Sequence, residues 1–372
     1  MPLSPLDDLL AHQTTETFDY VFTSDRNFYD RYYFNAHASS DELFLVAGMG
    51  QYPNLGVTDA FASISHGDTL YVVRASRELG SDRLDTTVGP FGVEVVEGLR
   101  TLRLRLDENE WGVAFDLTFE GVIPALLEPK HTTRQFSRIT MDSSRFAQVG
   151  RYSGTLTVAG QTYAVTPDRW KGVRDRSWGI RPVGEPVPPG IGVKVQRSHG
   201  FFHNWIPMQF DDFMIKVFFE EDADGNRFME ESKKIYNLGI DKPVEELGEP
   251  RHAFTYTSGT RELEKAVITF DHPSGEALSA TCHPLRTVYL AAGSGYLPAP
   301  DWGHGMYRGE RVVQGLRYDV GDPAVRKQYS LLNETLCRFE LSSGEVGYGM
   351  HENMCLGIYR PYGFDAPEAV AP

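Results

Sequence analysis

Cysteine, long apolar runs and positive charge are all scarce in this chain of 372 residues. The three cysteines, Cys282, Cys337 and Cys355, form no CxxC pair and leave one thiol over in any disulfide scheme, which favours a reducing compartment where they act as small core residues. No segment approaches the roughly 18 apolar residues of a membrane-spanning helix. The first residues, MPLSPLDDLLAHQ, lack the basic and apolar regions of a signal peptide. We therefore expect a cytoplasmic protein without membrane insertion.

Basic residues are outnumbered: 36 lysines and arginines stand against 51 aspartates and glutamates, so the formal net charge is -15. A surface with this excess of negative charge repels the phosphates of nucleic acids and anionic lipid headgroups. Nucleic acid is therefore not an expected partner. The composition is otherwise that of a folded globular protein, with 41% hydrophobic and 23% charged residues, and the length suffices for two domains.

Several motifs of common functional sites are also absent. The sequence contains no GxxxxGK(S/T) loop, no GxGxxG that opens a helix after a strand and no GxSxG elbow, so nucleotide binding has no support. The segment DADGN at 222–226 has its glycine in the wrong place for a calcium loop. His199 and His203 could share a metal ion on a helix, but the surrounding aromatic residues indicate a strand, in which they lie roughly 13 Å apart. We expect neither a metal site nor a cofactor.

What the chain has in abundance is apolar residues at every second position. This alternation is clearest in the ranges 101–107, 111–120 and 212–220, and it predicts strands with one buried face. Turn signals such as Asp107-Glu108-Asn109 separate the ranges. Many strands joined by short turns, without alternating helices, predict an all-β fold of antiparallel barrels or sandwiches with few short helices.

Helix signals are limited to two short segments. Ser4 can cap a helix that begins at Pro5, and a second helix is predicted after Asp322. A domain boundary is indicated by RPVGEPVPPG, in which four prolines within nine residues form a stiff, extended connector. We therefore predict an N-terminal β domain over residues 1–181, a connector over 182–192 and a C-terminal β domain over 193–372.

The segment KGVRDRSWGIR carries the densest set of charged and aromatic residues. In a strand, Asp175 and Ser177 face one side while Arg174, Arg176 and Trp178 face the other. One interpretation makes Asp175 a proton donor at the floor of a cavity, with Arg174 and Trp178 as substrate-binding candidates. The alternative is an Asp–Arg ion pair that locks a barrel corner, with Trp178 as a plug. The residues alone leave both open, because buried charged networks mark functional sites only in part of the cases.

A second segment, SHGFFHNWI, places His199, Phe201, His203 and Trp205 on one face of a strand. Aromatic walls with two titratable groups suit a mainly apolar binding pocket. Each histidine taken alone is better explained as a hydrogen-bonded core residue, whereas the set favours a functional site.

Two further segments follow near the end of the chain. Tyr348, Met350 and Glu352 share a strand face, where a carboxylate is costly unless it is paired or kept neutral, and the neutral form is the one that a general acid needs. Pairing of Glu352 with a buried arginine is the alternative. In WGHGMY, glycines suggest a loop from which His304 or Tyr307 could reach a ligand.

These segments resemble the carotenoid 1,2-hydratase (hydroxyneurosporene synthase)-like superfamily. The resemblance rests on residues 154–160, 172–181, 205–210 and 347–352, and Arg-Asp-x-x-Trp-Gly is its most specific part. It implies two lipocalin-like β-barrel domains with a ligand cavity at or near their junction. Relatives include carotenoid hydratases and the lipocalin-like cyclases of natural-product pathways. Where the hydratase pattern has histidine after the aspartate, this chain has Arg176, so His203 and His304 become the candidates for a proton relay.

Two classes of function remain. The first is a cofactor-independent enzyme, a lyase (hydratase or dehydratase) in preference to an isomerase or cyclase, in which Asp175 or Glu352 donates a proton to a small hydrophobic terpenoid, polyketide or aromatic substrate. Four aromatic residues would shape its cavity and stabilise cationic charge: Trp178, Trp205, Tyr307 and Tyr348. The second is a carrier that binds a hydrophobic metabolite without converting it. Titratable groups within aromatic strands favour the enzyme. The expected partner is a small hydrophobic molecule, and a homodimer is left open.

Overall fold

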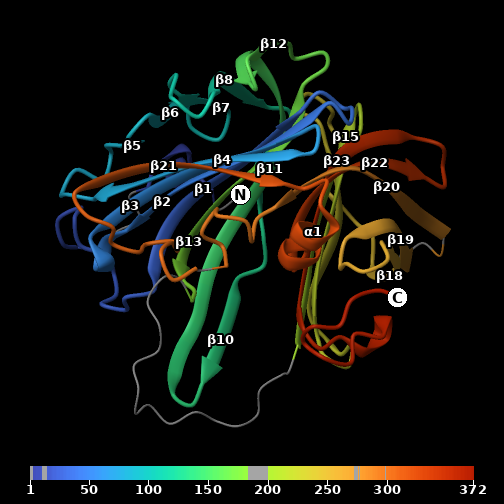
Figure 1. The fold of residues 1–372 in the computed structure, drawn as a ribbon. Helices are drawn as coiled ribbons and strands as arrows, with labels where there is room; N and C mark the ends of the chain where they lie inside the picture. The colour runs from blue at the N-terminus through green and yellow to red at the C-terminus, as the bar shows by residue number, and fades with distance from the viewer. Residues whose placement is uncertain (1–2, 11–14, 183–199, 272–274, 276, 298) are drawn as a thin grey trace.

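The computed structural model describes residues 3–10, 15–182, 200–271, 275, 277–297 and 299–372. These residues form two antiparallel sheets of 14 and nine strands, which lie side by side in the molecule (Figure 1). The predicted all-β class is thereby confirmed. No helix in the described part of the chain is long and apolar enough to cross a membrane.

The first sheet contains the strands of the N-terminal half and one strand from the C-terminal half. Its main path runs β21-β4-β3-β2-β1-β13-β11-β8-β7-β6-β5, and three further strands, β9, β10 and β12, pair with the long β11. The bounds are β1 (Phe28–His37), β2 (Leu43–Tyr52), β3 (Val57–His66), β4 (Thr69–Glu78), β5 (Thr87–Val88), β6 (Phe91–Glu97), β7 (Thr101–Leu106), β8 (Val113–Gly121), β9 (Leu126–Leu127), β10 (His131–Gln135), β11 (Arg138–Val158), β12 (Gln161–Val165), β13 (Lys171–Ile180) and β21 (Arg311–Asp319).

The second sheet is built from the C-terminal half alone, in the order β17-β16-β15-β14-β23-β22-β20-β19-β18. Its bounds are β14 (Gly200–Gln209), β15 (Phe213–Asp222), β16 (Arg227–Tyr236), β17 (Glu245–Glu246), β18 (Glu249–Tyr256), β19 (Leu263–Asp271), β20 (Ala277–Tyr289), β22 (Leu332–Leu341) and β23 (Val346–Gly357). The helical elements of the described residues are short: η1 (Pro5–Asp8), η2 (Pro53–Leu55), α1 (Pro323–Tyr329) and η3 (Arg360–Tyr362).

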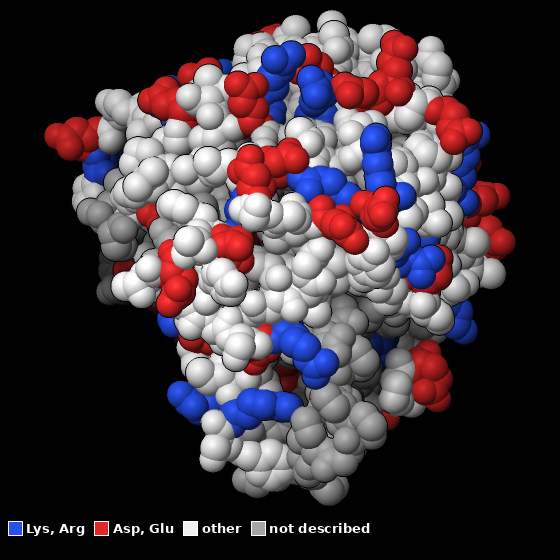
Figure 2. All heavy atoms as spheres, turned by 90° about the vertical axis from the view of Figure 1, so that its left-hand side faces the viewer, with Lys and Arg blue, Asp and Glu red and all other residues white. Residues whose placement is uncertain are grey.

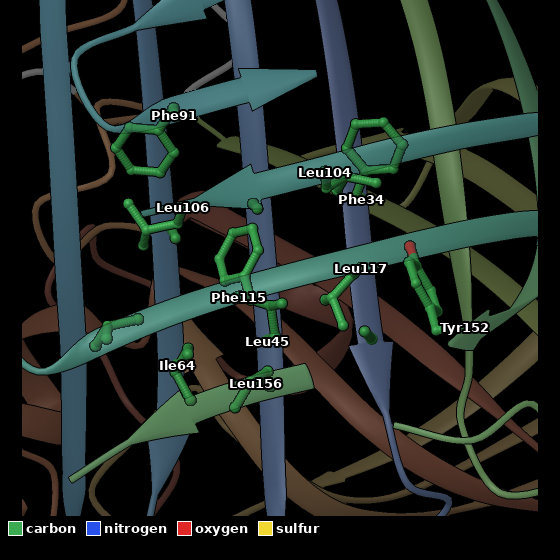
Figure 3. Packing of buried hydrophobic residues seen from close by; sticks show 14 of the residues in the cluster. Phe34, Leu45, Ile64, Phe91, Leu104, Leu106, Phe115, Leu117, Tyr152 and Leu156 are labelled. Carbon is green, nitrogen blue, oxygen red and sulfur yellow. The ribbon is translucent and has the colours of Figure 1, made fainter. Parts of the chain in front are cut away.

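Each sheet curls around a hydrophobic core of its own, and a third core lies between the sheets. Figure 3 shows the first core, where Phe34, Leu45, Leu104 and Leu117 meet across the inner face of the first sheet. The third core combines residues of both sheets, among them Tyr33 and Val46 from the first sheet and Trp205, Phe218 and Met350 from the second. Central strands such as β1 and β15 are therefore buried on both faces.

This double burial corrects one sequence expectation. β7 and β8 alternate as predicted, with Leu102, Leu104 and Leu106 inside and the arginines between them exposed. The range 212–220 was expected to bury one face, but β15 is buried along nearly its whole length. Its Phe213 and Ile215 enter the second core, whereas Met214 and Phe218 belong to the third core between the sheets. A strand whose polar residues lie at the junction of two sheets has the same alternation of polar and apolar residues as a strand with one face exposed to solvent.

The predicted short helices are present, the first of them as a single 3-10 turn that begins at Pro5. Asp322 caps α1, with its Oδ1 accepting a hydrogen bond from the Ala324 amide (2.8 Å). Pro182 is the last described residue before Gly200, so the rest of the predicted connector lies outside the described residues. The domain division at 182–192 stays a prediction, while β21 shows that the C-terminal half also supplies a strand to the first sheet.

Candidate active site

A cavity of about 690 Å³ lies between the two sheets, at the third core. Its walls combine aromatic, methionine and charged side chains from both halves of the chain. The residues lining it are Tyr29, Arg31, Tyr32, Tyr33, Glu128, Pro129, His131, Met141, Ser143, Arg145, Asp175, Ser177, Arg181, Pro182, Phe201, His203, Phe218, Glu220, Met229, Gly295, Tyr296, Ala299, Pro300, His304, Met306, Leu332, Glu352 and Met354.

The strand register explains which residues of the first sheet reach this cavity. Ser177 on β13 lies between Arg31 on β1 and Arg145 on β11, and two residues earlier Asp175 lies beside Tyr33. Residues opposite one another in an antiparallel pair share a face, and side chains alternate along each strand. The predicted separation of Asp175 and Ser177 from Arg174 and Arg176 is therefore seen, with the first pair in the cavity lining.

Asp175 is a carboxyl group held in the cavity without a hydrogen-bond partner for its Oδ1 among the described residues. Only 9% of the residue is exposed. Burial raises its pKa to about 6, and the neighbouring carboxylates of Glu128 and Glu352 act in the same direction, while Arg145 and Arg181 oppose them. A buried acid with a pKa in this range can exchange a proton near neutral pH.

His203 forms the charged counterpart on the second sheet. Its Nδ1 lies 2.9 Å from Oε1 of Glu220, and its Nε2 lies 3.7 Å from Oε1 of Glu352. Burial lowers the pKa of the imidazole, but the two carboxylates outweigh burial and raise the pKa to about 9. His203 is therefore an imidazolium at neutral pH, held between two acceptors. His131 extends the chain of titratable groups, with Nε2 3.5 Å from Glu220 Oε2.

Glu128 ties the two sheets together at the wall of the cavity. Its carboxylate pairs with Arg145 of the first sheet (2.6 Å) and Lys216 of the second (2.9 Å), and it accepts a hydrogen bond from Trp205 Nε1 (2.8 Å). Burial by itself raises the pKa of Glu128, but Arg145 and Lys216 overcome this effect and lower the pKa to about 2. The group is an ionised anchor rather than a proton donor.

A second buried acid lies behind Glu352. Glu334 on β22 is opposite Glu352 in the register, and it is 1% exposed. Burial and the charge of Glu352 raise the pKa of Glu334 well above its usual range. Tyr33 closes this part of the site by donating its hydroxyl to the sulfur of Met350 (2.9 Å) and contacting Trp205 edge to face. Glu334 is thus a neutral acid next to the lining carboxylate.

The opposite end of the cavity is rich in donors. Arg31 is buried and binds Asp59 (3.2 Å), but its Nη2 has no hydrogen-bond partner among the described residues. Tyr296 covers Arg31, with 5.5 Å between the guanidinium carbon and the ring centre. His304 packs against Tyr296, and burial together with the charges of Arg31 and Arg181 lowers its pKa well below the usual range. This histidine is neutral, in contrast to His203.

The structure brings together the four residues predicted as catalytic: Asp175, Glu352, His203 and His304 all line this cavity. The ion-pair partner of Glu352 is His203, not the arginine of the alternative interpretation. Whether the four residues take part in a reaction stays a prediction.

Most residues predicted to bind substrate lie elsewhere. Arg174 points toward the first core and pairs with Asp8. Trp178 contacts Phe146, and Trp205 donates a hydrogen bond to Glu128 from behind the lining. Two others lie away from the cavity, namely Tyr307, which is 56% exposed, and Tyr348, which faces Gln209 and Arg338 in the register. His199 lies outside the described residues.

Several lining residues were not predicted from the sequence, among them Arg31, Arg145, Arg181, Glu220 and Tyr296. The alternation along β15 could have identified Glu220, because it places this residue on the strand face opposite to Phe213 and Ile215. No pattern in the sequence placed Arg31 beside Ser177, because their strands are more than a hundred residues apart and their pairing depends on the sheet order. Among the described residues, no group of three or more His, Cys, Asp or Glu side chains is arranged to hold a metal ion.

Comparisons with known proteins concern the whole chain. The sequence model of a family described as "Family of unknown function (DUF8625)" matches residues 3–365, whereas no curated protein matches. Among solved structures, a protein provisionally described as an AttH from Nitrosomonas europaea gives a TM-score of 0.54 at 12% identity, covering 93% of this chain and 99% of that chain. At this identity the likeness shows a shared fold.

Two further structures are more distant. Kievitone hydratase from Nectria haematococca gives a TM-score of 0.46 at 13% identity, with 87% of this chain and 88% of that chain covered. CghA with Sch210972 gives a TM-score of 0.49 at 11% identity, with 93% of this chain and 90% of that chain covered.

Proposed function

This chain belongs to DUF8625, a family of unknown function, so its chemistry has to be inferred from the cavity. We propose that the protein is a cofactor-independent acid–base enzyme that acts on a small hydrophobic substrate. The reaction class is hydration or dehydration, with isomerisation and cyclisation as variants of the same proton transfers. One observation carries the proposal: an acid with a pKa of about 6, Asp175, lines the same cavity as the His203–Glu352 pair.

The two carboxyl groups have different surroundings, as acid–base catalysis requires. Asp175 holds a proton in part of the molecules near neutral pH because burial disfavours its charged form. Glu352, the candidate base, lies beside the imidazolium of His203, with 3.7 Å between its Oε1 and Nε2 of the histidine, and it lines the same cavity. Pairs of titratable groups whose surroundings differ in this way define the acid and the base of many enzymes.

The proton transfers then follow from this arrangement. In hydration, Asp175 gives its proton to one carbon of a double bond, a water molecule forms a bond from its oxygen to the other carbon, and Glu352 accepts the proton that the water loses. Dehydration is the reverse, and isomerisation uses the same two groups to add a proton at one carbon and remove one at another. Tyr33 and Phe201 line the cavity beside these groups, and aromatic faces stabilise positive charge on carbon.

The test compares variants across a panel of terpenoid, polyketide and aromatic compounds. Each purified protein is incubated without added cofactor, binding is followed by native mass spectrometry and conversion by product chromatography. Asp175→Asn and Glu352→Gln should bind the compound but convert it at least about a hundredfold more slowly, the size of a typical acid–base contribution. Asp241→Asn, at an exposed position on the second half, is the matched control and should behave like the wild type.

The carrier alternative gives a different result in the same experiment. Saturable binding with no conversion by the wild type, and equal affinity in both variants, would replace the enzyme with a protein that stores or moves a hydrophobic metabolite. Conversion that survives in both variants would show that the acid and base are other groups.

A further inference from the structure

The donor-rich end of the cavity is the feature that the proposed proton transfers leave unused. Four of its lining residues are Arg31, Arg181, Tyr296 and His304. Their chemistry differs from that of the His203 end, where Glu128, Glu220 and Glu352 supply carboxylates. The cavity therefore has one end with surplus donors and one end with carboxylates, and Asp175 interacts electrostatically with groups of both ends.

Arg181 is the first part of this donor set. The half-buried guanidinium lies over the ring of Tyr29 (4.3 Å to the ring centre) and within 5.8 Å of the ring centre of Tyr296. No carboxylate of the described residues lies within ion-pair distance of Arg181. Stacking occupies the face of a guanidinium and leaves its in-plane N–H groups for another acceptor.

Arg31 and His304 supply further polar groups that are more than nine-tenths buried. Arg31 is 2% exposed and His304 is 4% exposed, and each has one side-chain nitrogen, Nη2 and Nε2, without a partner among the described residues. A buried donor left without an acceptor costs free energy comparable to a lost hydrogen bond. Arg31 Nη2 is such a donor, so a guanidinium with unused hydrogen-bonding capacity lies beside the cavity, whereas the neutral His304 bonds the Ser294 backbone and keeps an unused lone pair on Nε2.

The backbone of β2 is shaped to keep Arg31 in this place. A Cβ atom at Gly50 would lie 2.7 Å from Arg31 Cγ and 2.9 Å from its Nη1, so only glycine lets the side chain lie across this strand. Asp59 on β3 is opposite Gly50 and holds the far side of the guanidinium. The position of Arg31 is thus built into three neighbouring strands.

We propose that this end of the cavity binds a resonance-delocalised oxyanion of the substrate, a carboxylate or the enolate of a 1,3-dicarbonyl, with Arg181 as its principal ligand. The planar fork of arginine matches two oxygens that share one charge. The apolar part of the substrate then extends past Asp175 toward Phe218 and Met229. The substrate class becomes a hydrophobic organic acid. The inference rests on the proposed function only in taking this cavity as the substrate site.

The experiment measures binding, so it needs no turnover. Calorimetric dissociation constants at neutral pH are compared for 2-naphthoate and its neutral isostere 2-naphthamide, and for 5-phenylcyclohexane-1,3-dione and its neutral enol ether. The wild type should bind at least one anion roughly tenfold or more tightly than its neutral partner, as expected for a charge-assisted hydrogen bond. In Arg181→Gln this ratio should fall to about one while affinity for the neutral partner is kept.

Arg317→Gln is the control, since it removes the same charge from an exposed position on β21 over Tyr71. It should keep the wild-type ratio. Preference for naphthoate alone identifies a carboxylate, and preference for the dione alone identifies an enolate. Equal binding of anions and neutral partners by the wild type, or a preference that persists in Arg181→Gln, would overturn the inference. An anion preference in a protein without turnover would leave this inference standing and sink the enzyme.

Discussion

At the scale of single residues, the buried carboxyl group of Asp175 lowers the stability of the fold at neutral pH. Because burial raises its pKa to about 6, the folded protein binds more protons than the unfolded chain between roughly pH 4 and 6. The free energy of unfolding therefore falls as pH rises through this window, and the ionised carboxylate remains a cost above it.

This cost predicts that Asp175→Asn stabilises the protein above about pH 7, by on the order of 2 kcal/mol, and has little effect near pH 4. Urea unfolding at both pH values measures the difference. The exposed Asp241→Asn should change stability by less than about 0.5 kcal/mol at either pH. A variant that is less stable than the wild type at the higher pH would mean that the carboxylate of Asp175 is paired in solution.

Glu128 shows the opposite relation between charge and stability. Its pKa of about 2 reflects the pairs with Arg145 and Lys216, so its contribution is present above roughly pH 4.5 and is lost as pH falls through 2. Glu128→Gln should lower the free energy of unfolding by about 3 kcal/mol at neutral pH, because it leaves buried cations without a partner.

The same substitution should matter progressively less in acid, which a urea series at decreasing pH would show. Glu120→Gln is the matched control, since that carboxylate pairs with Arg100 on the surface (3.0 Å, side chain 62% exposed) and such pairs contribute about 0–1 kcal/mol. A loss of equal size in the two variants would contradict the assignment of Glu128 as an anchor between the sheets.

At the scale of elements, the short η1 turn supplies a buried carboxylate to the first core. Asp8 at its end is fully buried beside the first core. Its carboxylate accepts hydrogen bonds from both terminal nitrogens of Arg174 and from the Leu99 amide, and its carbonyl accepts one from the Tyr32 hydroxyl (2.6 Å). The opening segment thus covers one end of the first core.

Removing this charge should destabilise the first sheet strongly. Asp8→Ala leaves the guanidinium of Arg174 buried without its carboxylate, and we expect a loss of roughly 3–5 kcal/mol. Thermal unfolding followed by near-ultraviolet circular dichroism measures it, with Asp241→Ala as the exposed control. A shift of the midpoint no larger than that of the control would mean that the segment does not occupy the barrel in solution.

Elements also show what the sequence could and could not reveal. The period of two identified β7 and β8 with their buried leucines, and it separated Asp175 from Arg174 on β13. It failed for β15, where Lys216 and Glu220 look solvent-facing but lie at the junction of the sheets. Alternation reports which side chains share a face and carries no information on what covers that face. The lining positions of Arg31 and Arg145 required the strand order, which depends on pairings between distant segments.

At the scale of the whole molecule, two features stand out: how charge is distributed on the surface, and how the two halves of the chain are joined. On the face in Figure 2, acidic and basic side chains are interspersed, so the net charge of -15 is not gathered into one acidic patch there. The N-terminal and C-terminal halves of the chain are joined by specific backbone and side-chain contacts. β21 of the C-terminal half pairs along the full length of β4, and Arg286 on β20 donates a hydrogen bond to the Gly67 carbonyl of the first sheet (2.8 Å).

This exchange predicts that the N-terminal half does not form a stable monomer alone. A fragment of residues 1–181 lacks β21, so it exposes the edge of β4, and it loses the cover over Tyr33, Val46 and the rest of its junction face. Unpaired edges and large apolar faces promote association between copies. Light scattering should show oligomers or aggregates, and co-expression with 193–372 should return a one-to-one complex. The control is the full chain cleaved at a protease site inserted in the connector, which should stay assembled. A monomeric fragment with cooperative unfolding would instead make the N-terminal half an independent domain, and the cavity an interface that forms between two folded units.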